Sequence, residues 1–329
     1  MSAVSPTMEG FFTERLMNQR QASPHTVGAY SDTFRLLLSF VQDKTGTAPC
    51  ALDFCDLDAP VIGTFLDHLE HERGNSVRTR NSRLAAIHSL FRFAALRHPE
   101  HAALIQRVLA IPSKRFSKTD VSFLDREEVD ALLGAPDRTR WTGRRDHALL
   151  ATAVETGLRV SELTGLCRRD VNLGKGPHIR CSGKGRKERC TPITTQTVAV
   201  LRVWLQERGG EPGDPLFPTS RGRRLSSGAV ALLVAKHAKA AQERCPTLKN
   251  KTVSPHVLRH SAAMSLLRAG VDITVIAMWL GHEQVETAQI YLHADLGIKE
   301  RALARTTPPN TTPGRYRAPD ALLAFLEAL

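Results

Sequence analysis

Apolar and polar positions alternate through the N-terminal third of the chain at the spacing of amphipathic helices. Segments 23–41, 58–74 and 76–98 each keep apolar side chains on one helical face. In the second segment, the residues at i, i+3, i+4 and i+7 are Ile62, Phe65, Leu66 and Leu69. This pattern predicts a helical bundle over residues 1–110.

The periodicity is interrupted by a polar, basic stretch, "PSKRFSKTD", at 112–120. We therefore expect a linker over 111–122 and a second domain over 123–305. Most of that domain is predicted to be helical. Its exception, "HIRCSGKGRKERCTPI", has two short strand-like runs around a glycine-containing turn, which is typical of a β-hairpin. The expected fold is mainly α with a small β-sheet: an N-terminal helical domain and a C-terminal α+β domain.

The composition points to a polyanionic partner. A length of 329 residues fits two domains better than one. The formal net charge of +12 and a pI of about 9.8 favour nucleic acid over an anionic membrane surface. The sequence has neither an apolar run near the roughly 18 residues of a membrane span nor the charged-then-apolar order of a secretion signal. The six cysteines form no C-x-x-C pair, which argues against a zinc site and favours a cytoplasmic protein with reduced thiols.

Two patches carry basic residues that local structure alone does not require. In "ETGLRVSELTGL", we expect Gly157 to end a helix and Arg159 to start the next, where a positive charge opposes the helix dipole. A bound anion would explain Arg159, and a surface pair with Glu162 is the simpler alternative on this patch alone. In the hairpin turn, glycines flank Lys184, so its amine can approach a nucleic-acid backbone, either as a phosphate contact or as a catalytic acid.

Histidines form a third candidate patch, "SPHVLRHSAA". His256 and Arg259 share a helical face at i, i+3, and His256 and His260 have the i, i+4 spacing of a metal pair. Val257 occupies the position where a metalloprotease motif needs Glu. We therefore expect no metal here.

The fourth patch is "GHEQVETAQIYLH", in which His282 precedes Tyr291 by nine residues. Val275, Met278 and Trp279, just before it, are expected in the core. Taken by itself, Tyr291 is better explained as a half-buried tyrosine with a hydrogen-bonded hydroxyl than as a nucleophile.

Together, the four patches suit attack on a phosphodiester without a metal. Two arginine forks can neutralise a phosphorane, a lysine can protonate a leaving 5′ oxygen, and a histidine can take the proton of a tyrosine nucleophile. The resulting ester retains the energy of the broken bond, so we expect neither ATP nor another cofactor.

The order of these residues resembles that of the tyrosine recombinase (phage integrase) family, and in particular its Xer-like members. The family pattern of Arg, Lys, His-x-x-Arg, His or Trp, and Tyr falls on Arg159, Lys184, His256, Arg259, His282 and Tyr291. The family's supporting acid, three residues after the first Arg, falls on Glu162. The resemblance covers about residues 10–305.

The resemblance implies a core-binding (SAM-like) N-terminal domain that, with the catalytic domain, clamps double-stranded DNA at specific sites. The basic residues expected to contact DNA are Arg78, Arg80, Arg83, Arg186 and Lys187. The resemblance also implies a covalent 3′-phosphotyrosine, a released 5′ hydroxyl and four subunits for strand exchange, with other recombinases as further candidate partners. The apolar tail at 306–329, "DALLAFLEAL" after a Pro-rich spacer, is expected to dock on a neighbouring subunit, with docking on its own domain as the alternative.

Several functions remain open on the sequence alone. The preferred one is a site-specific recombinase acting as integrase or transposase of a mobile element. Xer-type resolution of chromosome or plasmid dimers is the alternative within the same family. A type IB topoisomerase is disfavoured by the N-terminal bundle and the tail, and a non-catalytic DNA-binding relative by the filled catalytic pattern.

Overall fold

The computed structural model describes residues 4–116, 121–183, 188–282 and 284–294. The chain divides into two compact units, Met1–Thr119 and Asp120–Leu329. Each unit is described by itself below, as the N-terminal and the C-terminal unit.

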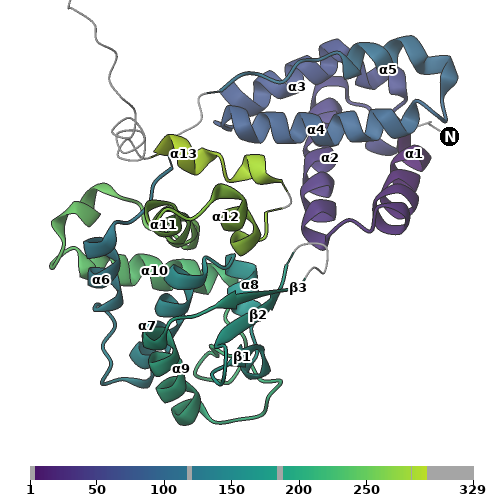
Figure 1. Cartoon of the computed structure of the whole chain (residues 1–329). Coiled ribbons are helices and arrows are strands. Elements are labelled where there is room, and N and C mark those ends of the chain that lie inside the picture. Colours follow the sequence, from purple (N-terminus) through teal and green to yellow (C-terminus); the bar gives the residue numbers. More distant parts are fainter. Residues whose placement is uncertain (1–3, 117–120, 184–187, 283, 295–329) are drawn as a thin grey trace, which may run out of the picture. The chain divides into compact units, whose positions relative to one another are not determined.

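The N-terminal unit is built from helices alone among its described residues (Figure 1). Its elements are α1 (Val4–Gly10), the π-helix η1 (Phe11–Gln19), α2 (Pro24–Thr45), the 3₁₀ turns η2 (Pro49–Ala51) and η3 (Phe54–Leu57), α3 (Ala59–His71), α4 (Val77–Ala94), η4 (Pro99–His101) and α5 (Ala102–Leu109). Polar caps set the starts of the longer helices. The Ser23 hydroxyl accepts the amide of Thr26 at α2, and the Asp58 carboxylate accepts the amide of Val61 at α3.

The apolar face predicted for 58–74 is confirmed. Its four residues are fully buried in α3: Ile62, Phe65, Leu66 and Leu69. They join one core with α2, α4 and α5, in which Phe11 packs against Phe34 and Phe93 with ring centroids 6.0 and 5.7 Å apart. Helix α3 ends at His71, and Gly74 follows in the left-handed conformation with φ +62°.

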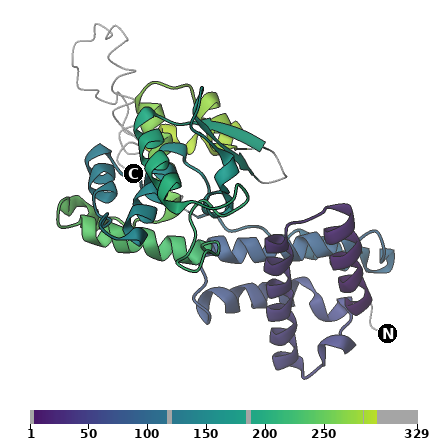
Figure 2. The same ribbon diagram turned by 90° about the horizontal axis from the view of Figure 1, so that it is seen from below.

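The C-terminal unit combines helices with one small sheet (Figures 1 and 2). Its helices are α6 (Arg126–Leu133), α7 (Trp141–Thr156), α8 (Val160–Gly165), η5 (Arg168–Asp170), α9 (Thr195–Arg208), α10 (Ser227–Ala241), η7 (Pro246–Asn250), α11 (Pro255–Arg268), α12 (Ile273–Leu280), η8 (Val285–Thr287) and α13 (Ile290–Ala294). Its strands are β1 (Val171–Asn172), β2 (His178–Ser182) and β3 (Glu188–Pro192). The expected fold class, mainly α with a small sheet, is confirmed.

The three strands form an antiparallel sheet in the order β1-β2-β3. The predicted hairpin is therefore present: Cys181 pairs with Arg189, and Ser182 with Glu188. Lys184, Arg186 and Lys187 belong to the segment 184–187, which lies outside the described residues. The sheet lies at one edge of the unit, beside the helices rather than between them (Figures 1 and 2).

Helix α7 is the centre of the C-terminal unit. It packs against both α9 and α11, and three consecutive residues, Ala148, Leu149 and Leu150, are all buried, so the helix is covered on more than one side. It ends where Gly157 takes the left-handed conformation with φ +61°, which lets the chain turn directly into α8.

The core positions expected before His282 are partly wrong. Val275 is 47% exposed and Met278 76% exposed, whereas Trp279 is partly buried against the core. The buried residues of α12 are instead Ile276, Ala277 and Leu280. Because the sequence of this helix, "ITVIAMWL", is apolar on nearly every side, its pattern could not indicate which face packs inward.

The tail at 306–329 lies outside the described residues, so its expected docking is untested. Among the described residues, no helix is both long and apolar enough to cross a membrane.

The packing of α7 against the preceding loop generates a prediction about stability. A Cβ added at Gly143 would lie 1.9 Å from the carbonyl oxygen of Asp137. We expect Gly143→Ala to destabilise the protein by ~1–3 kcal/mol, because the backbone must shift to admit the methyl group. Thermal and urea unfolding of the purified variant measure this.

The matched control is Gly228→Ala near the start of α10, where the nearest atom to an added Cβ is the Ser226 hydroxyl oxygen at 3.9 Å. Alanine there should be neutral or stabilise by up to ~1 kcal/mol. Equal unfolding curves for the two variants would contradict the prediction.

Candidate active site

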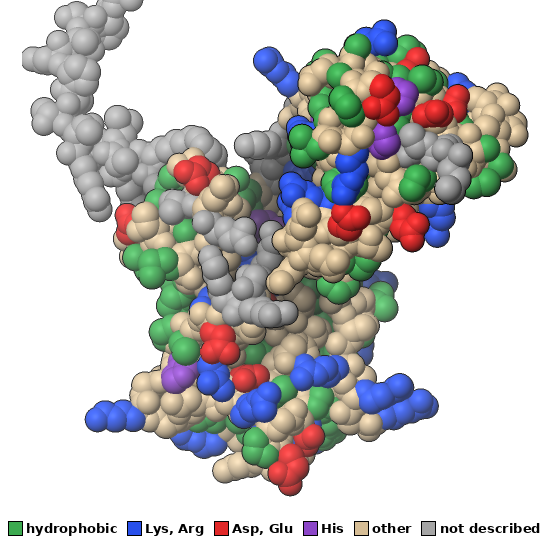
Figure 3. All heavy atoms as spheres, turned by 90° about the vertical axis from the view of Figure 1, so that its right-hand side faces the viewer, with side chains coloured by type: hydrophobic (Ala, Val, Ile, Leu, Met, Phe, Trp, Pro, Cys, Tyr) green, Lys and Arg blue, Asp and Glu red, His purple; other side chains and the backbone are tan. Residues whose placement is uncertain are grey.

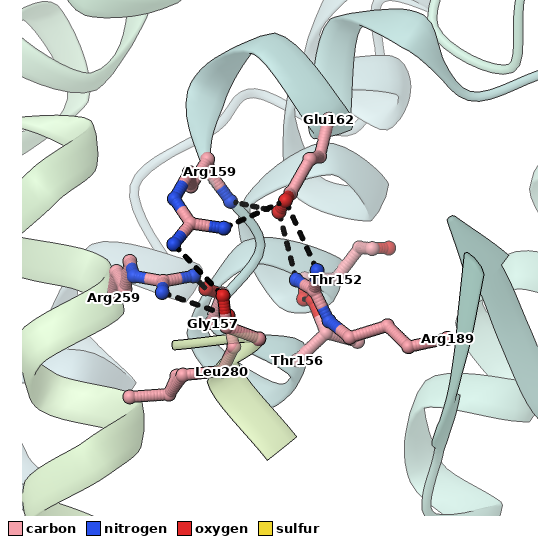
Figure 4. Close-up of polar contacts among 9 residues, drawn as sticks. Thr152, Thr156, Gly157, Arg159, Glu162, Arg189, Arg259 and Leu280 are labelled. Atoms are coloured by element: carbon pink, nitrogen blue, oxygen red, sulfur yellow. Dashed lines mark hydrogen bonds and ion pairs between the residues drawn. The ribbon is translucent and has the colours of Figure 1, made fainter. Parts of the chain in front are cut away.

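The guanidinium of Arg259 is held by the carboxyl ends of two helices. It is 3% exposed, and its two terminal nitrogens donate to the carbonyl oxygens of Gly157 at 2.7 Å and Leu280 at 2.8 Å (Figure 4). These oxygens lie at the ends of α7 and α12, which carry partial negative charge. Burial and the nearby Arg159 lower the pKa of Arg259 to about 10, so it stays protonated at neutral pH.

Arg159 lies at the start of α8, and its side chain bends back towards the same helix ends. One terminal nitrogen donates to Glu162 at 3.0 Å and the other to the carbonyl oxygen of Gly281 at 3.0 Å (Figure 4). Its side chain is 36% exposed, the most open of the arginines in this cluster. The sequence alone favoured a surface contact between Arg159 and Glu162. The structure instead places this pair in a cluster that includes Arg259.

Glu162 is the acid between two arginines. Its carboxylate accepts the backbone amide of Arg159 at 2.7 Å and both terminal nitrogens of Arg189 at 3.0 and 2.7 Å (Figure 4). Burial would raise the pKa of this carboxyl, but the hydrogen bonds from Arg189 and Arg159 outweigh burial and hold the pKa below its usual value. Glu162 is thus ionised at neutral pH.

Two glycines allow the helix ends to meet the arginines closely. Gly157 has φ +61°, and a Cβ there would lie 2.7 Å from Leu280 Cδ2. Gly281 has φ +65°, and a Cβ there would lie 2.7 Å from a terminal nitrogen of Arg189. Any other residue at either position would be strained and would push these groups apart.

Tyr291, in α13, is 1% exposed. Its hydroxyl and Nδ1 of His260 share a hydrogen bond of 3.0 Å, and its ring lies parallel to that of His282 at 6.5 Å between centroids. Burial raises the pKa of the phenol, while the charges of Arg259 and Arg159 act in the opposite direction. The hydroxyl therefore faces a histidine and lies within the electrostatic reach of both arginines.

Three histidines surround this tyrosine and the arginines. Burial and the charges of Arg259 and neighbouring groups lower the pKa values of His260 and His282 to about 4. His256 is more exposed than the other two, and its ring centroid is 4.3 Å from that of His260. Partial burial and the charges of Arg259 and Arg159 lower its pKa. Nδ1 of His282 is buried without a hydrogen-bond partner in the described part of the chain. All three rings are neutral at neutral pH and carry a lone pair.

The structure thus gathers most of the predicted site residues from distant parts of the chain. Those brought together are Arg159, Glu162, His256, Arg259, His282 and Tyr291. Lys184 lies outside the described residues. Two members were not predicted: Arg189, the second partner of Glu162, and His260, the partner of the tyrosine hydroxyl. His260 was noticed only for its spacing to His256, and Arg189 only as one of several basic residues in the hairpin.

The basic residues expected on the N-terminal unit differ in their surroundings. Arg78 is exposed and its guanidinium lies 5.4 Å from the ring centroid of Phe116. Arg80 is only 5% exposed and donates to Asn81 and to the carbonyl oxygen of Pro112, so its position argues against direct contact with DNA. Arg83 is half-buried, and its Nε and one terminal nitrogen have no partner among the described residues.

Lys and Arg side chains also lie on the surfaces of both units, as one face of the molecule shows (Figure 3). No group of three or more His, Cys, Asp or Glu side chains that could hold a metal ion occurs within 4–116, 121–183, 188–282 and 284–294.

The arrangement places the guanidinium groups of Arg159 and Arg259 near a buried tyrosine. Residues 122–296 match the Phage integrase family, and residues 11–98 match its "Phage integrase, N-terminal SAM-like domain". The chain belongs to the phage integrase, or tyrosine recombinase, family. Members of this family cleave and rejoin DNA strands, so the protein is an enzyme of that class.

Relatives extend over the whole chain. The "Putative integrase/recombinase y4rC" of Sinorhizobium fredii is 57% identical over 329 residues, which is 100% of this chain and 99% of that relative. The tyrosine recombinase XerC of Pelobacter propionicus is 34% identical and covers 94% of this chain and 99% of its own length.

Solved structures share the fold. The XerH site-specific recombinase bound to its difH substrate in a post-cleavage complex has a TM-score of 0.66 at 22% identity, covering 87% of this chain and 81% of that one. The Tn1549 transposon integrase in complex with circular intermediate DNA has a TM-score of 0.68 at 14% identity, covering 90% and 98%.

The lowered histidine pKa values generate a prediction about pH. In the unfolded chain a histidine takes up its proton near pH 6.5, whereas folded His260 and His282 do so at about 4. Between these values the unfolded state binds more protons, so stability should fall as the pH is lowered through this window. Histidine-selective NMR should show both rings neutral at pH 5.5.

Spectra of His260→Gln and His282→Gln each identify one ring signal, and a short unfolded histidine peptide serves as the titration control. Signals of both rings that titrate above pH 6 would contradict the prediction.

Proposed function

We propose that the protein is a site-specific DNA recombinase in which Tyr291 attacks a scissile phosphate and forms a covalent 3′-phosphotyrosyl link. A second strand end then attacks this link, and the DNA is rejoined. We further propose that it serves a mobile element as integrase or transposase.

The convergence of Tyr291 with the two arginines carries this proposal. Arg159 and Arg259 approach the site from α8 and α11, and Tyr291 from α13. Both arginines donate to consecutive carbonyl oxygens at the end of α12, Arg259 to Leu280 and Arg159 to Gly281. A guanidinium has five N–H donors. The side chain of each of these two arginines makes two hydrogen bonds to protein partners. The remaining donors could bind phosphate oxygens.

The roles of the remaining groups follow from their protonation. The arginines would neutralise charge that develops on the phosphate oxygens in the transition state. A neutral histidine is able to accept a proton, and His260 is the one bonded to the Tyr291 hydroxyl. His256 and His282 would support the phosphate. Lys184, on the segment between β2 and β3, would protonate the 5′ oxygen that leaves.

The chemistry needs no further cofactor. The phosphotyrosyl ester conserves the energy of the phosphodiester, so ATP is not required, and positive charge from arginine takes the part that a metal ion plays in other phosphoryl transfers. Cleavage should therefore proceed in the presence of a chelator.

Exchange of strands between two duplexes requires one active site for each cleaved strand, which implies four subunits on DNA. Double-stranded DNA carrying specific sites would be the substrate, contacted by Arg78 and Arg83 of the N-terminal unit and by Arg186 and Lys187 of the hairpin. The apolar tail, 306–329, would dock on a neighbouring subunit of this assembly. Other recombinases are further candidate partners.

The proposed biological role is supported by the full-length relative that carries the name integrase/recombinase at 57% identity. Resolution of chromosome or plasmid dimers is the second candidate, since the XerC protein of Pelobacter propionicus is 34% identical over 315 residues. A type IB topoisomerase ranks below both.

The nucleophile is tested by Tyr291→Phe. This variant should bind DNA normally but form no covalent adduct with nicked DNA that traps the intermediate, because only the attacking oxygen is removed. Denaturing electrophoresis detects the adduct, and the reaction should be unaffected by excess EDTA. Tyr316→Phe is the matched control and should form the adduct. An adduct that persists in Tyr291→Phe would refute the assignment.

The biological role is tested by recovering the DNA that is covalently linked to the protein in its host cells. If the protein serves a mobile element, sequencing should find both ends of that element and their junction in a circular form. A single chromosomal locus would indicate dimer resolution instead. Relaxation of supercoiled plasmid that carries no such sequence would point to a topoisomerase.

A further inference from the structure

Arg189 contacts the carboxylate of Glu162 with both of its terminal nitrogens, in a paired geometry that lysine cannot provide. Its side chain is only 14% exposed, whereas that of Arg159 on the other side of the carboxylate is 36% exposed. Both arginines therefore bind the same carboxylate. Arg189 is the buried partner, and Arg159 is the more open one, which a ligand can reach.

Arg189 also contacts Gly281, the second residue that accepts a hydrogen bond from the Arg159 side chain. A Cβ at Gly281 would lie 2.7 Å from a terminal nitrogen of Arg189 and 3.1 Å from its Cζ, so the guanidinium packs directly on the Gly281 backbone. The carbonyl oxygen of that same glycine accepts a hydrogen bond from Arg159 at 3.0 Å. Arg189 therefore contacts both of the groups that hold the Arg159 guanidinium.

Electrostatics alone would drive these groups apart. Arg159, Arg189 and Arg259 are three cations near a single anion, Glu162. Buried ion pairs often contribute little net stability, but removal of one partner is costly and changes the geometry of the other. The paired contact of Arg189 keeps Glu162 ionised and fixed, and the fixed carboxylate then directs Arg159.

We propose that Arg189 is a positioning residue for the recombination reaction: through Glu162 and Gly281 it fixes the direction of the Arg159 guanidinium. This inference rests on the function proposed above, in which Arg159 binds the scissile phosphate. Arg189 itself makes no contact with the substrate in this scheme.

The test compares Arg189→Gln, Glu162→Gln and the double variant in single-turnover formation of the covalent adduct on nicked DNA. Misplacement of a positioned group by about 1 Å can cost 100-fold, so we expect Arg189→Gln to slow adduct formation by roughly 10- to 100-fold. Affinity for DNA should change little. In the Glu162→Gln background, the further loss on removing Arg189 should be much smaller, because the group through which it acts is already gone.

The pH dependence separates positioning from simple stabilisation. The groups that face the Glu162 carboxylate are Arg159, Arg189 and, at longer range, Arg259 and the Cys181 thiol, whose pKa is raised to about 11. Arg189 lowers the pKa of Glu162 through its hydrogen bonds and its charge, so this pKa must rise when Arg189 is removed.

As the pH is lowered, the rate of Arg189→Gln should therefore begin to fall at a higher pH than that of the wild type, because protonated Glu162 releases Arg159. The double variant lacks the titrating carboxyl and should show no such fall relative to Glu162→Gln.

The matched control is Arg144→Gln, which removes another two-point arginine–glutamate contact in the same unit, with Glu207 at 2.7 and 2.6 Å. It should keep the wild-type rate and pH profile, even where its melting temperature falls as much as that of Arg189→Gln.

Hydrogen exchange at the Arg159 amide, which donates to Glu162, gives a readout that does not depend on catalysis. It should be faster in Arg189→Gln and unchanged in Arg144→Gln. A wild-type rate with unchanged exchange in Arg189→Gln would overturn the inference while leaving the proposed function intact. Failure of the wild-type protein to form a tyrosine-linked adduct would instead refute the proposed function.

Discussion

The carboxylate of Glu162 lies between two guanidinium groups, and the rest of the site depends on that contact. Arg159, Arg189 and Arg259 could not be collected in a partly buried space without negative charge to offset their repulsion and their loss of hydration. Glu162 supplies one full charge, and the carbonyl oxygens at the ends of α7 and α12 supply partial charge. The cluster keeps a net positive charge, as the proposed phosphate site requires.

This positive charge also determines the state of the neighbouring histidines. Burial and the arginines lower the pKa values of His260 and His282 to about 4, so at neutral pH these rings hold lone pairs rather than protons. The same arginines favour the ionised form of the Tyr291 phenol, against the effect of burial. In the proposed reaction, one set of charges would therefore act on both partners of the proton transfer: it keeps the histidine able to accept a proton and partly offsets the effect of burial on the tyrosine.

The backbone makes this arrangement possible at two glycines. Gly157 and Gly281 both adopt positive φ, and both present a carbonyl oxygen to an arginine at a point where a side chain would collide with its neighbours. In the motifs "TGLR" and "LGH", each glycine lies next to residues of the site. Both the turn of the chain and the close approach of the arginine require a residue without a Cβ.

Local rules of sequence account for much of the fold. The buried face of α3, the capping box of Asp125 and Glu128 at α6, and the β2–β3 hairpin each follow from residues close together in the chain. The buried face of α12 could not be predicted in this way. The helix is apolar on nearly every side, so its sequence pattern does not distinguish the buried face from the exposed one. Val275 and Met278 were therefore placed in the core although they are exposed.

The candidate site shows the same contrast between features that short stretches of sequence encode and features that depend on packing. The types and the order of the candidate site residues can be read from the sequence alone, since an arginine, a His-x-x-Arg pair, a Gly-His pair and a tyrosine are visible as short motifs. The residues that support them become visible in the folded chain. Arg189 meets Glu162 across 27 positions of sequence, and His260 meets Tyr291 across 31. Such contacts depend on how helices and strands pack, and no periodicity or local motif encodes the partner of a side chain at that separation.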